Sequence, residues 1–308
     1  MSFKRILVPV ERRVVSQLAL DVARRVAEKS GASVSLVEVI PPGAAGGVAE
    51  LEAELEATCR EELERLAESL ESAGISTSLS IRRGRSYEEI IRAVIDDAHD
   101  LVVKVAGEEG WFRETFLGTT DLNLLRKCPC PVWIVHEEGA SGYGRILAAL
   151  HLDPENENGS ALDRRILEIT TTIGRMHSSE VHVAHCYEPM AGGWLERRLG
   201  EERYRAWIES ARESASRAFE EAIAPFATEI PPERRHLVRG DPGMLLPRLA
   251  SELSVDLIVL GSVARVGVPG LLVGNTAERV LAQVRASVLT IKPESFVSPI
   301  PSAGSARP

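Results

Sequence analysis

The chain has 308 residues, of which 44% are hydrophobic and 26% charged, and its net charge at pH 7 is −9. The length fits about two domains, and the composition excludes a disordered, collagen-like or coiled-coil chain. No apolar run reaches the roughly 18–20 residues of a membrane helix, and the N-terminus lacks the apolar core of a signal peptide. The four dispersed cysteines do not resemble a disulfide framework. We therefore expect a cytosolic protein.

The negative charge is spread unevenly. Residues 1–140 contain 17 basic and 24 acidic side chains (net −7), whereas residues 141–308 contain 19 and 21 (net −2). Neither half is basic, so neither has the positive face of a protein that binds a phosphate backbone. We expect no direct nucleic-acid binding and no membrane association.

Strand and helix patterns alternate along the first half. Short apolar or alternating runs predict strands, and apolar residues three or four positions apart predict helices. In chain order the expected elements are a strand at 6–10, a helix around 15–26, a strand at 33–40, a long helix around 51–70, a strand at 77–81, a helix around 90–98, a strand at 101–105, a helix from about 119 and a strand at 132–136.

The second half repeats this order, which indicates a duplication. The pair Arg83-Gly84 recurs 156 positions later as Arg239-Gly240, and the same separation pairs Gly118 with Gly274. Five strands alternating with four helices predict a parallel sheet with helices on both faces. The fold class is therefore α/β, with two tandem doubly wound, Rossmann-like or flavodoxin-like domains related by pseudo-two-fold symmetry. Their expected bounds are 1–138 and 144–297, followed by a disordered tail at 298–308.

One segment of the second half has the composition of a ligand-binding loop. It runs from Gly261-Ser262-Val263-Ala264 to Gly274-Asn275-Thr276, between a predicted strand and a predicted helix. Glycine allows close approach of a ligand to the backbone, and the first N–H groups of a helix can bind phosphate. The order strand, Gly-x-x-Gly, nine residues, Gly-Ser, helix is the nucleotide-loop pattern of universal stress proteins, and the whole chain resembles a tandem member of that family.

The second copy departs from the family pattern at three positions. Ala264 stands where the second glycine would be, and Asn275 stands where a serine would contact phosphate. His151 occupies the strand end where nucleotide-binding members usually carry Asp. Arg265 is a candidate for neutralising phosphate charge. The resemblance thus implies a candidate ATP or small-ligand site at Gly261, Ser262, Ala264, Arg265, Gly274, Asn275, Thr276 and His151.

The loop of the first copy departs further from the pattern. Val105 replaces the first glycine and Glu108 the second, with Glu109 beside it. Two carboxylates would repel a triphosphate. Gly118 and Thr119 remain and are expected to begin a helix, and Glu11 stands at the strand end that corresponds to His151. We expect this copy to be a non-binding partner domain.

Other histidines and cysteines are not expected to form a site. His182 and His185 are three positions apart on a strand and point to opposite faces, which argues against a shared metal. Cys128-Pro-Cys130 precedes a core strand and is expected to pack, with reversible oxidation as the alternative. No metal site is expected, and no partner could be assigned to His99 or His236.

Catalytic motifs are absent from the sequence. There is no G-x-x-x-x-G-K-[ST] loop, G-x-S-x-G elbow, H-E-x-x-H or paired C-x-x-C. The resemblance implies a role in stress endurance, including resistance to DNA damage, and we expect a nucleotide- or ligand-responsive binding module without turnover. The alternatives are a ligand-free scaffold for an unidentified protein partner, and a slow ATPase. Both a monomer of tandem domains and a homodimer remain open.

Overall fold

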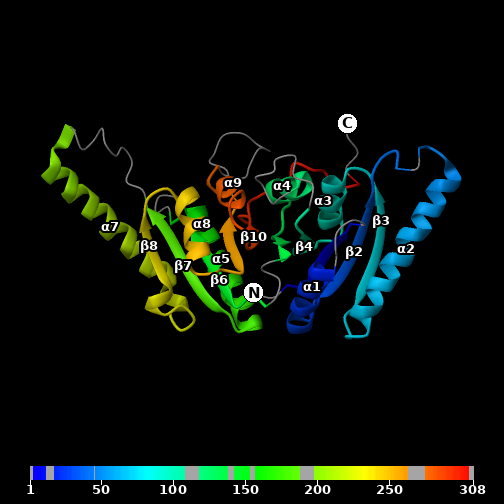
Figure 1. Cartoon of the computed structure of the whole chain (residues 1–308), viewed down its shortest axis with the longest axis horizontal. Helices are drawn as coiled ribbons and strands as arrows, with labels where there is room; N and C mark the ends of the chain where they lie inside the picture. Colours follow the sequence, from blue (N-terminus) through cyan, green and yellow to red (C-terminus); the bar gives the residue numbers. More distant parts are fainter. Residues whose placement is uncertain are drawn as a thin grey trace.

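The fold is described from a computed structural model of the chain. It covers residues 3–11, 17–44, 46–107, 118–137, 142–152, 157–187, 198–262 and 275–304. Figure 1 shows the two halves side by side. None of the helices in these residues combines the length and the apolar character needed to span a membrane.

The first half forms the predicted elements in the predicted order. They are β1 (Arg5–Val10), α1 (Gln17–Ser30), β2 (Ser33–Ile40), α2 (Ala49–Glu71), β3 (Thr77–Arg83), α3 (Ser86–Asp96), β4 (Leu101–Val105), α4 (Thr119–Lys127) and β5 (Val132–Val135). The apolar stripe predicted for the long helix is only partly buried: Leu63, Leu66 and Leu70 are in the core, whereas Leu51 is 51% exposed. The first turns of α2 therefore extend past the sheet.

The second half repeats the alternation. Its elements are β6 (Arg145–Leu150), α5 (Glu157–His177), β7 (Glu180–Tyr187), α7 (Glu201–Ile223), β8 (Arg235–Arg239), α8 (Pro242–Glu252), β9 (Leu257–Gly261), α9 (Asn275–Leu281) and β10 (Ser287–Ile291). The central strand β9 is apolar and buried over Leu257–Leu260 because helices cover both faces of the sheet.

The ten strands in the described ranges form one sheet, in the order β3-β2-β1-β4-β5-β10-β9-β6-β7-β8. Neighbouring strands are parallel except β5 and β10, which pair antiparallel with Val132 opposite Thr290 and Ile134 opposite Val288. Read outward from this junction, the two halves have the same strand order. The arrangement confirms two tandem doubly wound units with pseudo-two-fold symmetry.

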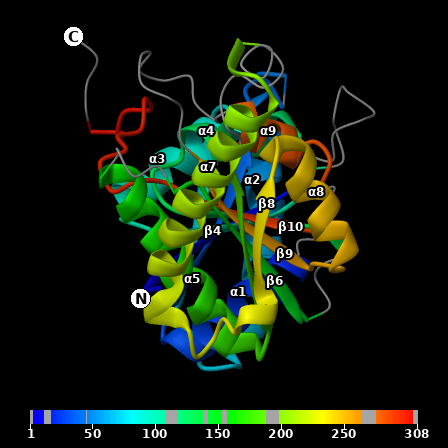
Figure 2. The same cartoon turned by 90° about the vertical axis from the view of Figure 1, so that its left-hand side faces the viewer.

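Two layers of helices enclose the sheet. One face packs against α1, α2, α5 and α7, and the other against α3, α4, α8 and α9. Figure 2 shows the two layers of the second half, with α5 and α7 on one side of the sheet and α8 and α9 on the other. The carboxyl ends of the parallel strands, where ligands bind in such sheets, lie at one edge of each half.

The expectation of a disordered tail is not met over residues 298–304. These residues leave the second half and lie against the first, next to α3 (Figure 1). Ile300 is half-buried against the core cluster that contains the apolar side chains of α3, and the Ala303 N–H donates to Asp96 Oδ1 at 3.1 Å. The burial of Ile300 and this hydrogen bond offset the loss of chain entropy. Residues 305–308 are outside the described part of the chain.

Candidate functional site

Two of the predicted site residues meet at the carboxyl ends of neighbouring strands. β6 ends at Leu150 and β9 at Gly261, and the strands are parallel with Ala149 opposite Leu260. Continued by one residue, this register places Leu150 opposite Gly261, and His151 follows level with Ser262. Asn275 and Thr276 are the first residues of α9, whereas Ala264, Arg265 and Gly274 lie outside the described residues.

A buried carboxylate fixes the turn that carries His151. Asp163 Oδ1 accepts the His151 N–H at 3.0 Å, and Oδ2 accepts the Leu152 N–H at 2.8 Å. Burial raises the pKa of Asp163, and the two hydrogen bonds only partly oppose this effect. The His151 side chain is exposed. The turn thus holds the backbone rigidly and leaves the imidazole facing solvent.

Gly261 is needed for packing between a helix and a strand. A Cβ atom at this position would lie 2.8 Å from Leu162 Cδ2 and 3.5 Å from Ile166 Cδ1, both on α5. The sequence interpretation was that this glycine allows a ligand to approach the backbone. The structure gives a different reason, because the missing side chain would point toward α5.

Ser262 does not face a ligand, which corrects its assignment to the site. Its side chain is 1% exposed, and its Oγ donates to the Leu125 carbonyl of the first half at 3.0 Å. Its N–H donates to Ile291 O at 2.9 Å. The hydroxyl is therefore used in the junction between the copies, and the N–H continues the pairing of β9 with β10 inside the second copy. Sequence reasoning could not foresee this, because the junction depends on the pairing of β5 with β10.

Lys292 is the centre of that junction. Its buried Nζ donates to Leu125 O at 2.7 Å, to Ser262 Oγ at 2.7 Å and to Ser262 O at 3.1 Å. Burial lowers the pKa of Lys292 to about 7. Arg126, next in α4, forms an ion pair with Glu278 of α9. The carboxyl end of α4 therefore contacts the second copy at Ser262 and at Glu278, which precede and follow residues 263–274 in the sequence.

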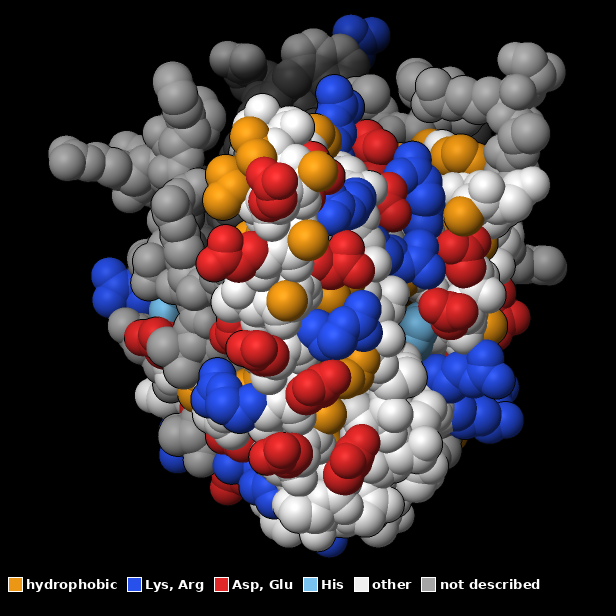
Figure 3. All heavy atoms as spheres, turned by 90° about the vertical axis from the view of Figure 1, so that its right-hand side faces the viewer, with side chains coloured by type: hydrophobic (Ala, Val, Ile, Leu, Met, Phe, Trp, Pro, Cys, Tyr) orange, Lys and Arg blue, Asp and Glu red, His pale blue; other side chains and the backbone are white. Residues whose placement is uncertain are grey.

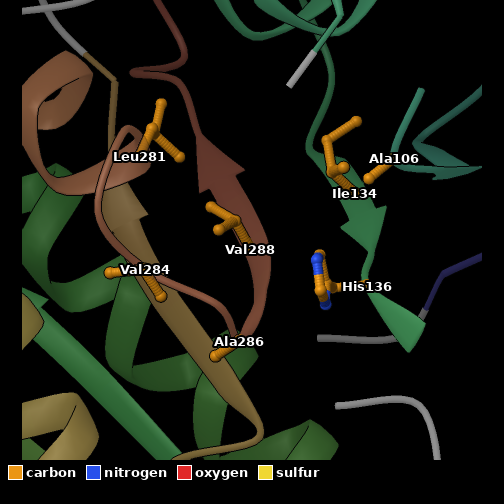
Figure 4. Close-up of a pocket in the computed structure, with 7 residues that line it drawn as sticks. All are labelled: Ala106, Ile134, His136, Leu281, Val284, Ala286 and Val288. Atoms are coloured by element: carbon orange, nitrogen blue, oxygen red, sulfur yellow. The ribbon is translucent and has the colours of Figure 1, made fainter. Parts of the chain in front are cut away.

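Different residues stand at the symmetry-related position, where His136 donates its backbone N–H to Ser287 Oγ of the second copy at 3.0 Å. At the separation of 156 residues, Ser262 corresponds to Ala106, Lys292 to His136 and Leu281 to Leu125. These three counterparts, Ala106, His136 and Leu281, line a hollow of about 10 Å³ between β5 and β10 (Figure 4). That volume admits about one water molecule. The junction is therefore asymmetric, with a lysine contact on one side only.

The strand ends of the first copy hold a buried ion cluster instead of an open site. Lys104 Nζ lies 2.8 Å from Asp121 Oδ1 and 3.2 Å from Glu11 Oε2. Lys104 is 2% exposed and Asp121 is fully buried. Burial lowers the pKa of Lys104, but the charges of Asp121 and Glu11 outweigh burial and hold the pKa above its usual value. Lys104 is thus an ammonium ion enclosed by carboxylates.

Asp121 also accepts hydrogen bonds from two backbone N–H groups, one before and one after residues 108–117 in the chain. Its Oδ2 accepts the Gly107 N–H at 2.8 Å and the Gly118 N–H at 2.9 Å. Gly118 is the residue that caps α4, as predicted for a helix start. Glu108 and Glu109, the carboxylates expected to repel phosphate, lie outside the described residues. A lysine within the apolar strand run 101–105 was the available signal for this cluster, and sequence reasoning missed it.

The second copy has neither the carboxylates nor the lysine at the corresponding positions. Leu260 replaces Lys104, and Ala277 replaces Asp121. His151 replaces Glu11 after the first strand of the copy. Leu260 and Ala277 are both buried among apolar side chains. The two copies therefore differ in their charged residues at the place where their strand ends could meet a ligand.

His99 and His236, for which the sequence indicated no partner, each have one in the structure. His182 Nδ1 and His236 Nε2 are 3.1 Å apart, with stacked rings, and His99 Nε2 lies 2.8 Å from Ser35 Oγ. Burial lowers the pKa of each of these three histidines. The Sγ atoms of Cys128 and Cys130 are 3.6 Å apart in the core. These contacts belong to the packing of the sheet rather than to its ligand edge.

The sheet formed by the described strands, with its two halves related by pseudo-two-fold symmetry, defines a tandem doubly wound α/β protein. Two solved structures share this fold. A protein from Pseudomonas aeruginosa UCBPP-PA14, described as a universal stress protein, is 26% identical with a TM-score of 0.71, and the match covers 95% of this chain and 94% of that one. A universal stress protein from Archaeoglobus fulgidus DSM 4304 is 20% identical with a TM-score of 0.69, and the match covers 96% of this chain and 98% of that one.

Sequence comparison identifies the family. The profile of the universal stress protein family matches residues 2–136 and again residues 142–292. Universal stress protein E of Escherichia coli K12 is 30% identical over 231 residues, which are 74% of this chain and 72% of the relative. The chain belongs to the universal stress protein family and contains two tandem copies of its domain.

Proposed function

We propose that this protein is a ligand-responsive binding module for stress endurance, including resistance to DNA-damaging agents, and that it acts in the cytosol without catalysis. The ligand is a nucleotide such as ATP, or another small molecule, and it binds at the strand ends of the second copy. Its contacts come from His151, Gly261, Ala264, Arg265, Gly274, Asn275 and Thr276. Binding would change the surface that the protein presents to a partner.

The difference in charge between the two copies carries this proposal. In the first copy, Asp121 and Glu11 place two carboxylates around Lys104 at the ligand edge. In the second copy, Ala277 and His151 stand at the positions of these carboxylates. With Lys104 the first-copy cluster carries a net charge of −1, whereas the second copy has neither the two carboxylates nor the lysine, because Leu260 stands at the position of Lys104. The net repulsion of a phosphate group by this cluster is therefore absent from the second copy. This difference supports the second copy, rather than the first, as the place where an anionic ligand binds.

The lack of turnover is supported by the sequence. No Walker loop or other phosphate-transfer motif occurs in the chain. A bound nucleotide would thus act by occupying its site, as a signal rather than as a substrate. The internal pairing of β5 with β10 supports a monomer, because the antiparallel junction is already satisfied within one chain.

A ligand-free scaffold is the second candidate, favoured by the surface of α2. The side chain of Leu51, in the first turn of this helix, is 51% exposed, and that of Val48, just before the helix, is 43% exposed. Acidic and basic side chains are interspersed on the same side of the molecule (Figure 3), and Arg83 pairs with Glu52 and Glu56 of the helix. An exposed apolar end beside charged pairs is suited to contact with another protein.

Titration calorimetry with Mg-ATP distinguishes the two candidates. The ligand-responsive module predicts binding at one site per chain. Replacing Gly274 with Trp places a bulky ring in the phosphate loop, and we expect at least a tenfold loss of affinity, about 1.4 kcal/mol. Gly304→Trp is the matched control: this glycine lies in the tail with open space around its Cβ position, and its variant should bind as the wild type does. Absence of heat in a folded wild-type protein would contradict ATP as the ligand and favour the scaffold.

A further inference from the structure

The environment of Asp121 has the composition of an oxyanion-binding site. Two backbone N–H groups, from Gly107 and Gly118, converge on Oδ2 at 2.8 and 2.9 Å. An ammonium group, Lys104 Nζ, contacts Oδ1 at 2.8 Å. Backbone N–H groups at the start of a helix together with a lysine are the donors that proteins use for phosphate and carboxylate ligands. Here the same donors are satisfied by a side chain of the protein itself.

A helix cap alone does not explain this arrangement. An acidic residue in the first turn commonly accepts the N–H of the capping residue. Asp121 is fully buried, and it also accepts an N–H from Gly107, on the far side of residues 108–117. It further neutralises a buried ammonium. A Cβ atom at Gly107 would lie 3.4 Å from Asp121 Oδ2 and 3.9 Å from Lys104 Nζ, so little space remains around the carboxylate.

We propose that Asp121 is a built-in anion, which occupies the oxyanion position of the first copy and thereby excludes phosphate-bearing ligands from it. The first copy is closed by its own carboxylate, and the ligand capacity of the chain is one. The statement that the chain binds one ligand rests on the proposed function of the second copy. The role of Asp121 in the first copy does not depend on that proposed function. Ala277 stands at the matching position of the second copy and has no carboxylate that could occupy the oxyanion position there.

Replacement of Asp121 by Ala tests the proposal, because it removes one carboxylate group and leaves the donors in place. Formate has the same O–C–O group and should enter the vacated position. We expect the unfolding equilibrium constant of Asp121→Ala at pH 7, measured by urea denaturation, to fall about tenfold when formate is at roughly ten times its Kd, relative to chloride at equal ionic strength. The wild-type protein should show no difference between the two salts.

Two controls separate an anion site from a simple cavity. Formamide has nearly the shape of formate without the charge, so it should not stabilise Asp121→Ala. Asp121→Asn fills the space with a neutral group, so this variant should not respond to formate. An equal response of Asp121→Ala and Asp121→Asn to formate, or rescue by formamide as strong as by formate, would overturn the proposal.

A refolding measurement covers the case in which Asp121→Ala is too unstable for denaturation curves. The variant is diluted from urea into formate or into chloride, and the folded fraction is read from its circular dichroism. We expect a folded fraction several-fold higher in formate, and equal fractions in both salts would contradict the proposal. None of these measurements uses a nucleotide, so failure of Mg-ATP to bind the second copy would leave the result for Asp121 intact.

Discussion

Replacement of Lys104 by Met is expected to lower the free energy of unfolding by about 3–5 kcal/mol, the usual cost of removing one partner from a buried ion pair. Lys104 is 2% exposed and compensates the charge of Asp121, which is fully buried, and of Glu11. Methionine keeps the volume of the side chain but leaves Asp121 with only its two backbone donors. The loss is therefore electrostatic rather than a loss of packing.

Urea denaturation at pH 7 measures this change. The matched control is Lys29→Met, because Lys29 is exposed in the last turn of α1. Its removal should cost no more than about 1 kcal/mol, the value of a surface cation at a helix end. A loss below about 1 kcal/mol for Lys104→Met would contradict the assignment of Lys104 as the cation that compensates Asp121.

The stability of the wild-type protein relative to Lys292→Met is expected to rise with pH between 7 and 9. Burial, which the neighbouring Cys128 only partly offsets, lowers the pKa of Lys292 to about 7 in the folded protein. In the unfolded chain a lysine has a pKa of ~10.4. Between these values the unfolded chain binds a proton that the folded chain does not, so the free energy of unfolding increases with pH. From pH 7 to 9 the contribution of Lys292 is about 2 kcal/mol.

The measurement is the difference in unfolding free energy between the wild type and Lys292→Met at several pH values. Taking the difference removes the contributions of the other titrating groups, which both proteins share. Lys29→Met again serves as the control, and its difference from the wild type should stay constant over this range. A constant difference for Lys292→Met would show that the amine at the junction between the copies does not titrate there.

Much of the fold could be predicted from the sequence, because local patterns determine it. Apolar runs such as 101–105 and the constant separation of 156 residues indicate the strands, the alternation and the duplication. Family resemblance adds the loop at 261–276. The tail was predicted wrongly over 298–304, because its Ser, Pro and Gly content suggests disorder. That composition does not show that Ile300 and the backbone of Ala303 find partners near α3.

The site was predicted less well, since its side chains meet through long-range packing. Ser262 follows a buried strand like many ligand-binding serines, but the antiparallel pairing of β5 and β10 turns it toward Leu125. Asp121 is an ordinary acidic residue in the first turn of a helix when it is seen in the sequence. Its role depends on Lys104, 17 positions earlier, whose burial follows only from the position of β4 within the sheet.

A crystal structure of the protein grown with Mg-ATP tests the division of roles between the two copies most directly. We expect one nucleotide per chain, at the carboxyl ends of β6 and β9, with its phosphates beside residues 274–276. Asp121 should keep its contacts with Gly107, Gly118 and Lys104 in that structure. A nucleotide at the strand ends of the first copy, with Asp121 displaced, would contradict both the closed first copy and the assignment of the ligand to the second.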